Sequence, residues 1–397
     1  MNIECIKCKG RHSCGRPFCP ITAKIHSQKR LNIDAKQEYS GETPNVFIGR
    51  YGYPDINVGL LNTEQYNNHD DPLLWSKEDY QIQQIVDLRT QLINSSFKAN
   101  IKKFDDRFLE MSQEVSMAEK PVDVEVKLNK KPFFKLNLNQ DAAPHGPNVR
   151  LEKAELTENP KIPTKVDKVV SDTDMKAADA IKYLYKKDTD EHYLTKIISL
   201  GNLGLKRNRK LVPTRWSITA IDDTVGKQVL EEIKQFKPYD YAAYFGGHLG
   251  NYYLILFFPE AWSYELFETV VGENSSFATD FEPYEGRKYY ADNTAGGYYA
   301  SRLAITEHLK SIKRQGSVLA LRFITKEYWA PLGVWVVRNA TRKSLESKPI
   351  TFGSKELMMK YAKAFIQKKF GFDLDILLRQ SKLLKELKEQ KRLVQFT

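Results

Sequence analysis

Four cysteines lie close together near the start of the chain, and thiolates readily bind zinc and iron. Cys5, Cys8, Cys14 and Cys19 follow the spacing C-x2-C-x5-C-x4-C, and the chain contains no other cysteine. Two close pairs of thiolates can complete a tetrahedron around one zinc ion, at about 2.3 Å. A structural zinc site is predicted, with His12 able to replace one cysteine. An iron–sulfur cluster and unmetallated thiols are the alternatives.

A basic stretch in the middle of the chain is the second candidate site. It holds five cations and no acidic residue: Lys206, Arg207, Arg209, Lys210 and Arg215. Such a cluster suits the phosphates of a nucleic acid, and a solvated surface is the plainer interpretation. Residues 212–221 are predicted to form a strand whose alternation places Trp216 with Ile218 on a buried face. Trp216 could stack on a base only if it pointed outward.

Four further side chains could line a cationic pocket for a phosphate or a nucleotide. They are His248, Arg302, Arg322 and Arg338. Partnered arginines and a histidine that caps a turn would explain them equally well. The sequence contains no Walker A loop, no H-E-x-x-H pair and no nucleophile elbow, so it assigns no catalytic residue.

The end of the sequence carries a short pattern of apolar and polar residues. Gln390, Leu393 and Phe396 are spaced by three, and residues at that spacing eclipse in a 3₁₀ turn. The pattern Q-x-x-L-x-x-F resembles the peptide by which replication and repair proteins dock on the sliding clamp PCNA. The sequence ends at Thr397, where such peptides usually have a second aromatic residue. A frayed amphipathic helix is the alternative.

Composition and charge limit the class of protein. The 397 residues are 41% hydrophobic and 28% charged, with a net charge of +11, which favours polyanionic partners. No apolar run approaches the roughly 18 residues of a membrane span, and the first residues lack the apolar core of a signal peptide. A cytoplasmic, nucleoid-associated protein with no membrane partner is predicted.

The predicted fold class is α+β, a mixed sheet with flanking helices between a zinc knuckle and a C-terminal helical tail. Strands are expected at residues 212–221, 252–258, 317–324 and 333–338, and a hairpin at 45–61. Helices are expected at 75–110, 225–236, 298–313 and 355–370. Residues 118–170 are rich in lysine and proline, which indicates either a long irregular segment or a seam between two domains. The predicted domains are 1–28, 29–170, 171–372 and 373–397.

The chain resembles the archaeal Nre family of DNA repair proteins in four segments: CIKCKGRHSCGRPFCP, FIGRYGYPDINVG, KLVPTRWSITAIDD and QKRLVQFT. The resemblance spans essentially the whole chain and implies a role in repairing damaged DNA together with PCNA. It also implies that the four cysteines bind metal and that Gln390, Leu393 and Phe396 contact the clamp. It transfers no catalytic residue.

The leading hypothesis is therefore a zinc-containing DNA repair factor that binds DNA and PCNA, with other repair proteins as further partners. One alternative is an enzyme that acts on nucleotides or DNA by phosphoryl or ADP-ribosyl chemistry in the cationic pocket. Another is an RNA-binding protein, since basic charge and a zinc knuckle suit RNA equally well.

Overall fold

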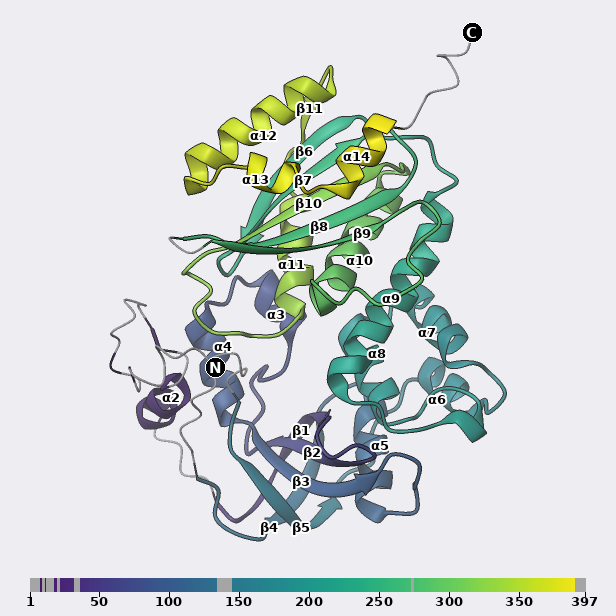
Figure 1. The fold of residues 1–397 in the computed structure, drawn as a ribbon. Helices are drawn as coiled ribbons and strands as arrows, with labels where there is room; N and C mark the ends of the chain where they lie inside the picture. Colours follow the sequence, from purple (N-terminus) through teal and green to yellow (C-terminus); the bar gives the residue numbers. More distant parts are fainter. Residues whose placement is uncertain are drawn as a thin grey trace. The chain divides into compact units, whose positions relative to one another are not determined.

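The chain folds into two compact units, one of Met1–Val225 with Trp329–Leu332 and the other of Gly226–Tyr328 with Gly333–Thr397. Figure 1 shows the computed structural model, which describes residues 8, 11, 18–19, 22–31, 36–133, 145–272 and 275–389. Among these residues, none of the helices combines the length and the apolar character needed to cross a bilayer. The fold is mixed α and β, as the sequence predicts.

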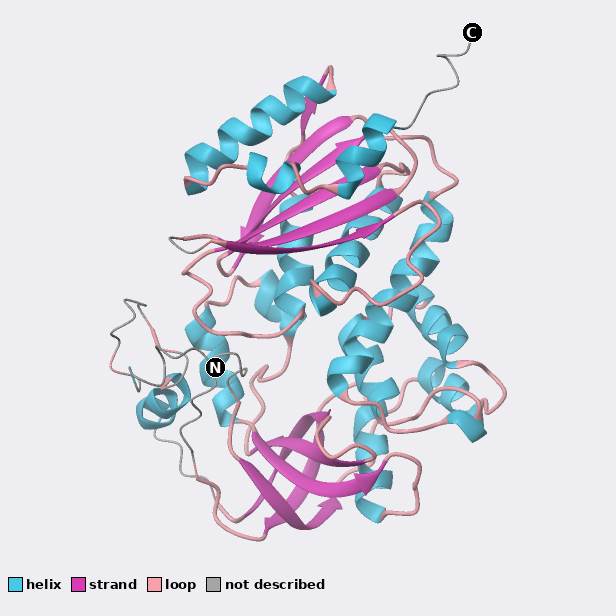
Figure 2. Cartoon of the chain, viewed as in Figure 1, coloured by secondary structure: helices cyan, strands magenta, loops and turns pink. Residues whose placement is uncertain are grey.

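The first unit is built around a closed five-stranded barrel, drawn as magenta arrows in Figure 2. Its strands are β1 (Glu38–Ile48), β2 (Asp55–Thr63), β3 (Ile93–Asn100), β4 (Val122–Leu128) and β5 (Asn148–Leu156). Around the barrel they follow the order β1-β2-β3-β5-β4, and β4 closes onto β1. Only the β3–β5 pair is parallel.

The barrel closes because β1 pairs on both sides. Residues at its start pair with β4, and residues at its end pair with β2, with a register shift between Glu42 and Asn45. Gly41 lies at this crossing, where an added Cβ would meet the Thr63 carbonyl oxygen at 2.2 Å. The alternating residues that point inward, such as Val58, Phe97 and Val124, form one core.

Helices complete the first unit. They are α2 (Ala23–Leu31), α3 (Pro72–Lys77), α4 (Ile82–Gln91), α5 (Arg107–Met117), α6 (Thr164–Ser171), α7 (Ala177–Lys186), α8 (Glu191–Ser199), η1 (Lys206–Asn208) and α9 (Thr214–Ile233). Among them, α5 and α8 pack against strand β1 of the barrel. Side-chain caps fix several of these starts: Asp106 accepts from Phe108 and Leu109 at α5, and Asp190 accepts from Tyr193 at α8.

The second unit contains a six-stranded mixed sheet. Its strands are β6 (Tyr241–His248), β7 (Asn251–Phe258), β8 (Ser263–Val270), β9 (Ser276–Glu282), β10 (Ser317–Ile324) and β11 (Ile350–Phe352). Their order is β11-β6-β7-β10-β8-β9, and β10 runs parallel to β8.

Helices cover both faces of this sheet (Figure 1). One face is covered by α12 (Lys355–Phe370), α13 (Asp375–Leu378) and α14 (Lys382–Glu389), and the other by α10 (Ala295–Ser311) and α11 (Trp335–Leu345). The α12 side is apolar, with Leu256, Leu321 and Phe323 of the sheet packed against helical side chains such as Ile366. The α10 side contains buried polar side chains, among them Arg302 and Glu282.

Several predicted elements are confirmed. The hairpin appears as β1 and β2, residues 252–258 lie in β7, and residues 317–324 coincide with β10. The helices predicted at 298–313 and 355–370 appear as α10 and α12.

Other predicted elements are wrong. Residues 212–221 do not form a strand, because Ser217, Ile221, Val225 and Val229 are all buried and lie four apart, which is the spacing of one helical face. The strand predicted at residues 333–338 is wrong, because α11 begins at Trp335. Residues 93–100 form β3 where a helix was expected. The segment 118–170 contains β4, β5 and α6, and residue 170 lies in α6 inside the first unit.

Candidate nucleic-acid interface

The predicted basic stretch runs from η1 to the start of α9. Lys206, Arg207, Lys210 and Arg215 are exposed, so their charges are available at the surface. Arg209 has a different role: its guanidinium donates to the carbonyl oxygens of Gly204 and Val170, at 2.9 and 2.7 Å. Burial lowers the pKa of Arg209, and the Asp172 carboxylate opposes this effect. Four of the five predicted cations therefore face solvent, and the fifth holds the loop that presents them.

The start of α9 is fixed to the turn between β1 and β2. The Ile48 N–H donates to Thr214 Oγ1 at 2.9 Å, and the ring centroids of Tyr53 and Trp216 lie 5.6 Å apart. The prediction that Trp216 faces the core is wrong. On a helix it lies beside the buried stripe that begins at Ser217, and its side chain is 46% exposed.

The turn itself presents two further aromatic rings. Tyr51 is 76% exposed and Tyr53 is 45% exposed, and the Arg50 guanidinium lies 5.0 Å from the Tyr51 ring centroid. Gly52 allows the tight turn with a φ of 84°, a conformation that costs other residues energy. We call Arg50, Tyr51, Tyr53 and Trp216 the tip surface. It combines exposed rings with a cation, as surfaces that bind nucleic acids do.

The cysteine cluster lies only partly within the described residues. Cys8 and Cys19 are both buried, whereas Cys5 and Cys14 are outside the described residues. The Cys8 carbonyl accepts from the Arg11 N–H, and the Cys19 carbonyl accepts from the Ala23 N–H at the start of α2. Within the described residues, no three His, Cys, Asp or Glu side chains gather as a metal site would require.

The predicted clamp contacts Gln390, Leu393 and Phe396 also lie outside the described residues. The helix that precedes them, α14, is attached firmly to the sheet. The buried Glu265 carboxylate of β8 accepts from Ser381 Oγ and from the N–H groups of Lys382 and Leu383, the last two at 2.9 and 3.2 Å. Leu383 and Leu384 of α14 are buried in the apolar core of the second unit. Residue 390 therefore follows directly in the sequence after a helix that is attached to the sheet.

The four candidate pocket residues are all buried in the second unit. Arg302 Nη1 lies 2.7 Å from Glu282 Oε2, and that carboxylate also accepts from Tyr298 and Trp262. Arg322 pairs with Glu268, and its Nε donates to Asn251 Oδ1 at 3.1 Å. His248 and Arg338 are 7% and 5% exposed. Two of the three arginines are thus neutralised by carboxylates, which favours a structural role for that pair.

The sequence interpretation missed a charged cluster in the first unit. Asp70 Oδ2 lies 3.1 Å from His192 Nε2 and also accepts from Asn45 Nδ2, and Lys196 donates to the Pro44 carbonyl. Arg89, whose Nη2 is 3.9 Å from Asp70, lies over the Trp75 ring. These residues come from four separate segments. The polar run N-N-H-D-D at residues 67–71 was the only local signal of the cluster.

Electrostatic coupling shifts the pKa values in this cluster. Burial alone would raise the pKa of Asp70, but His192 and Arg89 hold it well below its usual range. Burial alone would lower the pKa of His192, and the Asp70 carboxylate outweighs burial and raises it. Burial lowers the pKa of Lys196 to about 8. In this cluster, the single Asp70 carboxylate therefore interacts with the basic side chains of His192, Arg89 and Lys196.

Comparison with known families and proteins agrees with the resemblance noted in the sequence. The family described as "Archaeal Nre, N-terminal" matches residues 13–277, and "Archaeal Nre, C-terminal" matches residues 282–396. "DNA repair protein NreA" of Archaeoglobus fulgidus is 38% identical over 89% of this chain and 91% of its own length. "DNA repair protein NreB" of the same organism is 33% identical over 96% of this chain and 97% of its own length. "DNA repair protein NreA" of Haloferax volcanii is 36% identical over 78% of each chain. No solved structure shows a significant match.

Proposed function

The chain belongs to the archaeal Nre family, and we propose that it is a DNA repair factor that binds DNA and docks on the PCNA clamp. The role in repair is carried by one observation: relatives named DNA repair proteins align with this chain over nearly the full length of both partners. DNA binding and clamp docking are finer steps that rest on this chain's own residues.

The exposed cations before and at the start of α9 support DNA binding. Lys206, Arg207, Lys210 and Arg215 lie within ten residues of one another, and Arg209 holds their loop in place. Cations at a surface bind phosphates by releasing counterions, so the affinity falls steeply with salt. The net charge of +11 acts in the same direction.

The sequence of residues 390–397 and the anchoring of α14 support clamp docking. A short peptide that follows a fixed helix can engage one partner while the remainder of the protein engages another. A weak clamp contact and a weak DNA contact, joined in one chain, then give an avidity well above either alone.

The four cysteines fit a structural zinc ion. Cys8 and Cys19 are buried in a segment that is otherwise rich in polar residues, and thiolates are the ligands that zinc takes in closed four-coordinate sites. When bound, zinc would hold Cys5, Cys8, Cys14 and Cys19 together and fix the path of the chain into α2. A complete set of four ligands leaves no open position for catalysis.

The enzymatic alternative has less support. Its pocket needs free cations, whereas Arg302 and Arg322 are buried in ion pairs with Glu282 and Glu268. The PCNA-docking peptide favours the DNA repair proposal over the RNA-binding alternative, because a protein that docks on PCNA is brought to DNA.

A first titration tests clamp docking. Calorimetry with archaeal PCNA should show binding by the full chain and none by a variant that lacks residues 390–397. Equal binding by both proteins would remove the docking assignment.

A second titration tests DNA binding. The double variant Arg207→Ala with Lys210→Ala should bind DNA of any sequence more weakly, and the slope of log affinity against log salt should fall by about 2. The control pair Lys360→Ala with Lys368→Ala, two exposed lysines of α12, should leave both quantities unchanged.

A further inference from the structure

The barrel of the first unit has a topology that is often used to bind nucleic acids. Its strand order is β1-β2-β3-β5-β4 with β4 closing onto β1, and α5 lies between β3 and β4 in the chain. A five-stranded Greek-key barrel of this kind is an OB-fold, which binds oligonucleotides across strands 2 and 3 and by the loops that follow strands 1 and 4. Topology alone does not establish function, so the side chains on that face must decide.

The register shows which side chains lie on the outer face. Ile56, Val58 and Leu60 of β2 point into the core, so Asn57 and Gly59 lie on the outer face, where the Asn94 side chain covers Gly59. Gly59 pairs with Phe47 on one side and with Ser96 on the other, and Ser96 pairs with Arg150. Asn57 pairs with Lys98 in the neighbouring row.

Three of these outward residues are exposed and suit a polyanion that carries aromatic bases. Phe47 is 46% exposed, although an apolar ring would normally be buried. Lys98 and Arg150 are exposed on the neighbouring strands. Asp55, at the start of β2, accepts from Asn100 Nδ2 at 2.8 Å. The face thus offers one ring and two cations, and the Asp55 carboxylate accepts a hydrogen bond from the Asn100 amide.

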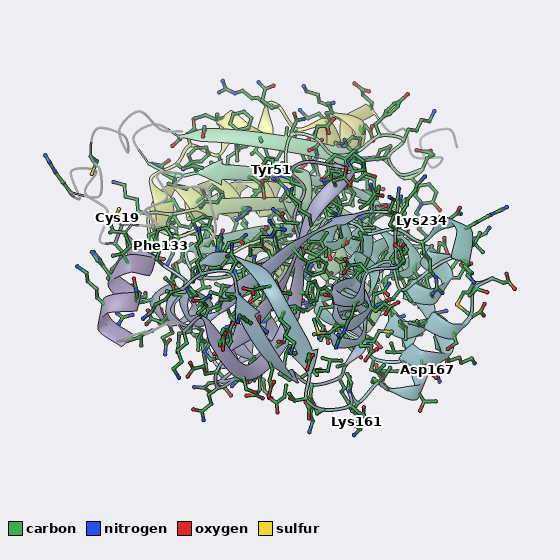
Figure 3. The ribbon with its side chains drawn as sticks, turned by 90° about the horizontal axis from the view of Figure 1, so that it is seen from below. Cys19, Tyr51, Phe133, Lys161, Asp167 and Lys234 are labelled. Atoms are coloured by element: carbon green, nitrogen blue, oxygen red, sulfur yellow. The ribbon has the colours of Figure 1, made fainter. Side chains whose placement is uncertain are left out.

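The loops after β1 and β4 also combine exposed aromatic rings with cations. The loop after β1 presents Arg50, Tyr51 and Tyr53 of the tip surface, and the Lys98 ammonium reaches back to the Asp55 carbonyl beside it. The loop after β4 contains Lys130, whose ammonium lies 5.9 Å from the ring centroid of Phe133, and that ring is 51% exposed. Figure 3 labels Tyr51 and Phe133 in a view of the barrel from below.

We propose that the outer face of β1, β2 and β3, together with the tip surface, binds single-stranded DNA by stacking its bases on Phe47, Tyr51 and Trp216. Lys98, Arg150 and Arg50 would contact the phosphates. This inference rests on the proposed function and specifies the form of DNA that is bound. In a duplex both faces of each base are covered by neighbouring bases, whereas in a single strand they are free to stack on protein rings.

The tryptophans provide a direct readout. The chain contains five tryptophans, of which Trp75, Trp262, Trp329 and Trp335 are at most 8% exposed and Trp216 is 46% exposed. A 20-nucleotide oligothymidylate should therefore quench fluorescence that arises from Trp216. Trp216→Phe should keep a ring for stacking and lose the quenching. An abasic strand of the same length has the same charge without bases, and it should bind more weakly and leave the fluorescence unchanged.

The second readout is the affinity for a labelled oligothymidylate, measured by fluorescence polarisation. Phe47→Ala and Tyr51→Ala should each weaken binding by at least about fivefold, the lower range for one stacked base. Their affinity for a 20-base-pair duplex should change less than about twofold. Tyr289→Ala is the matched control, since this ring of the second unit is 83% exposed, and it should bind as the unaltered protein does. Thermal unfolding of each variant verifies that it is folded.

The outcomes separate the two proposals. Unchanged oligothymidylate binding by Phe47→Ala and Tyr51→Ala, or quenching that persists in Trp216→Phe, overturns this inference. Salt-dependent binding to duplex alone also overturns it, while DNA binding by the repair factor stands. Failure of the unaltered protein to bind either form of DNA removes the DNA-binding part of the proposed function itself.

Discussion

The indole of Trp216 lies against the ring of Tyr53, with 5.6 Å between their centroids. These residues are more than 160 positions apart in the sequence, and their contact joins the start of α9 to the turn between β1 and β2. The hydrogen bond from the Ile48 N–H to Thr214 Oγ1 fixes the same junction. The end of the basic stretch, at Arg215, is therefore joined to the aromatic turn.

Replacing Trp216 should cost little stability. Trp216→Ala removes a half-exposed ring and one aromatic contact, so the free energy of unfolding should fall by about 1 kcal/mol or less. Trp75→Ala is the comparison, because Trp75 is fully buried and donates Nε1–H to the Asn68 carbonyl. It should cost about 3–5 kcal/mol. Urea denaturation followed by circular dichroism measures both losses, and equal losses would contradict the placement of Trp216 at the surface.

Glu265 should be essential for the attachment of α14. Glu265→Ala leaves Ser381 Oγ and two backbone N–H groups without their acceptor, and the free energy of unfolding should fall by about 2–3 kcal/mol. Glu386→Ala on the exposed side of the same helix should change it by less than about 0.5 kcal/mol. Hydrogen exchange of α14 locates the effect. Unchanged protection of this helix in Glu265→Ala would show that other contacts hold it.

The sequence predicted elements with strong local signals and failed where distant contacts decide. Residues 355–370 have helical periodicity, with Ser354 as a cap and Gly371 at a φ of 64°, and they form α12 as predicted. Residues 212–221 alternate in polarity over a few positions, which favours a strand, yet they continue the longer four-residue spacing of α9. Short apolar runs such as residues 333–338 suit a buried strand or a buried helix equally well.

The candidate site shows the same division. The cations at 206–215 could be found because they are neighbours in the sequence, whereas the pairing of Trp216 with Tyr53 depends on the fold. The outward direction of Phe47 depends on the barrel register, which alternation in one strand does not reveal. The network of Asp70, His192 and Lys196 joins separate segments, and no local pattern brings these residues together.

The ion pair between Arg302 and Glu282 should be strongly coupled to stability. Glu282→Gln keeps the shape of the side chain and removes the charge that balances the Arg302 guanidinium, at a site where both side chains are at most 2% exposed. Loss of one partner of a buried pair costs about 3–5 kcal/mol. Glu285→Ala, three residues further on and exposed, should be nearly neutral in the same urea denaturation experiment. A loss below about 1 kcal/mol in Glu282→Gln would contradict this assignment.

Metal analysis should find one zinc ion per chain if the cysteines form the proposed site. Cys8→Ser and Cys19→Ser should each reduce the zinc content, because serine is a much poorer zinc ligand than a thiolate. Chelation should make the segment before α2 more sensitive to limited proteolysis, since bound metal contributes to folding in such small segments. Iron with visible absorbance in place of zinc would support the cluster alternative. Thiols without metal would remove the site.

The contact between His192 and Asp70 should make stability depend on pH in a defined direction. The pKa of His192 is raised above 6.5, so its contribution is present below pH 6.5 and is lost as the pH rises through the folded-state value. The pKa of Asp70 is lowered below 3.8, so its contribution is present above pH 3.8 and is lost only in acid. Between about pH 5.5 and 7.5, therefore, only His192 of this pair changes its contribution.

His192→Gln should make the change in the free energy of unfolding across that interval more positive, by about 1 kcal/mol or less, because the ring is 32% exposed and partly screened. Lys196, with a pKa of about 8, is disfavoured in its charged form, and its contribution rises with pH only above that value. Measurements below about pH 7.5 keep the two effects apart. His26→Gln, at an exposed histidine of α2, is the control and should retain the slope of the unaltered protein. An identical slope in His192→Gln would show that the pair with Asp70 does not govern this pH range.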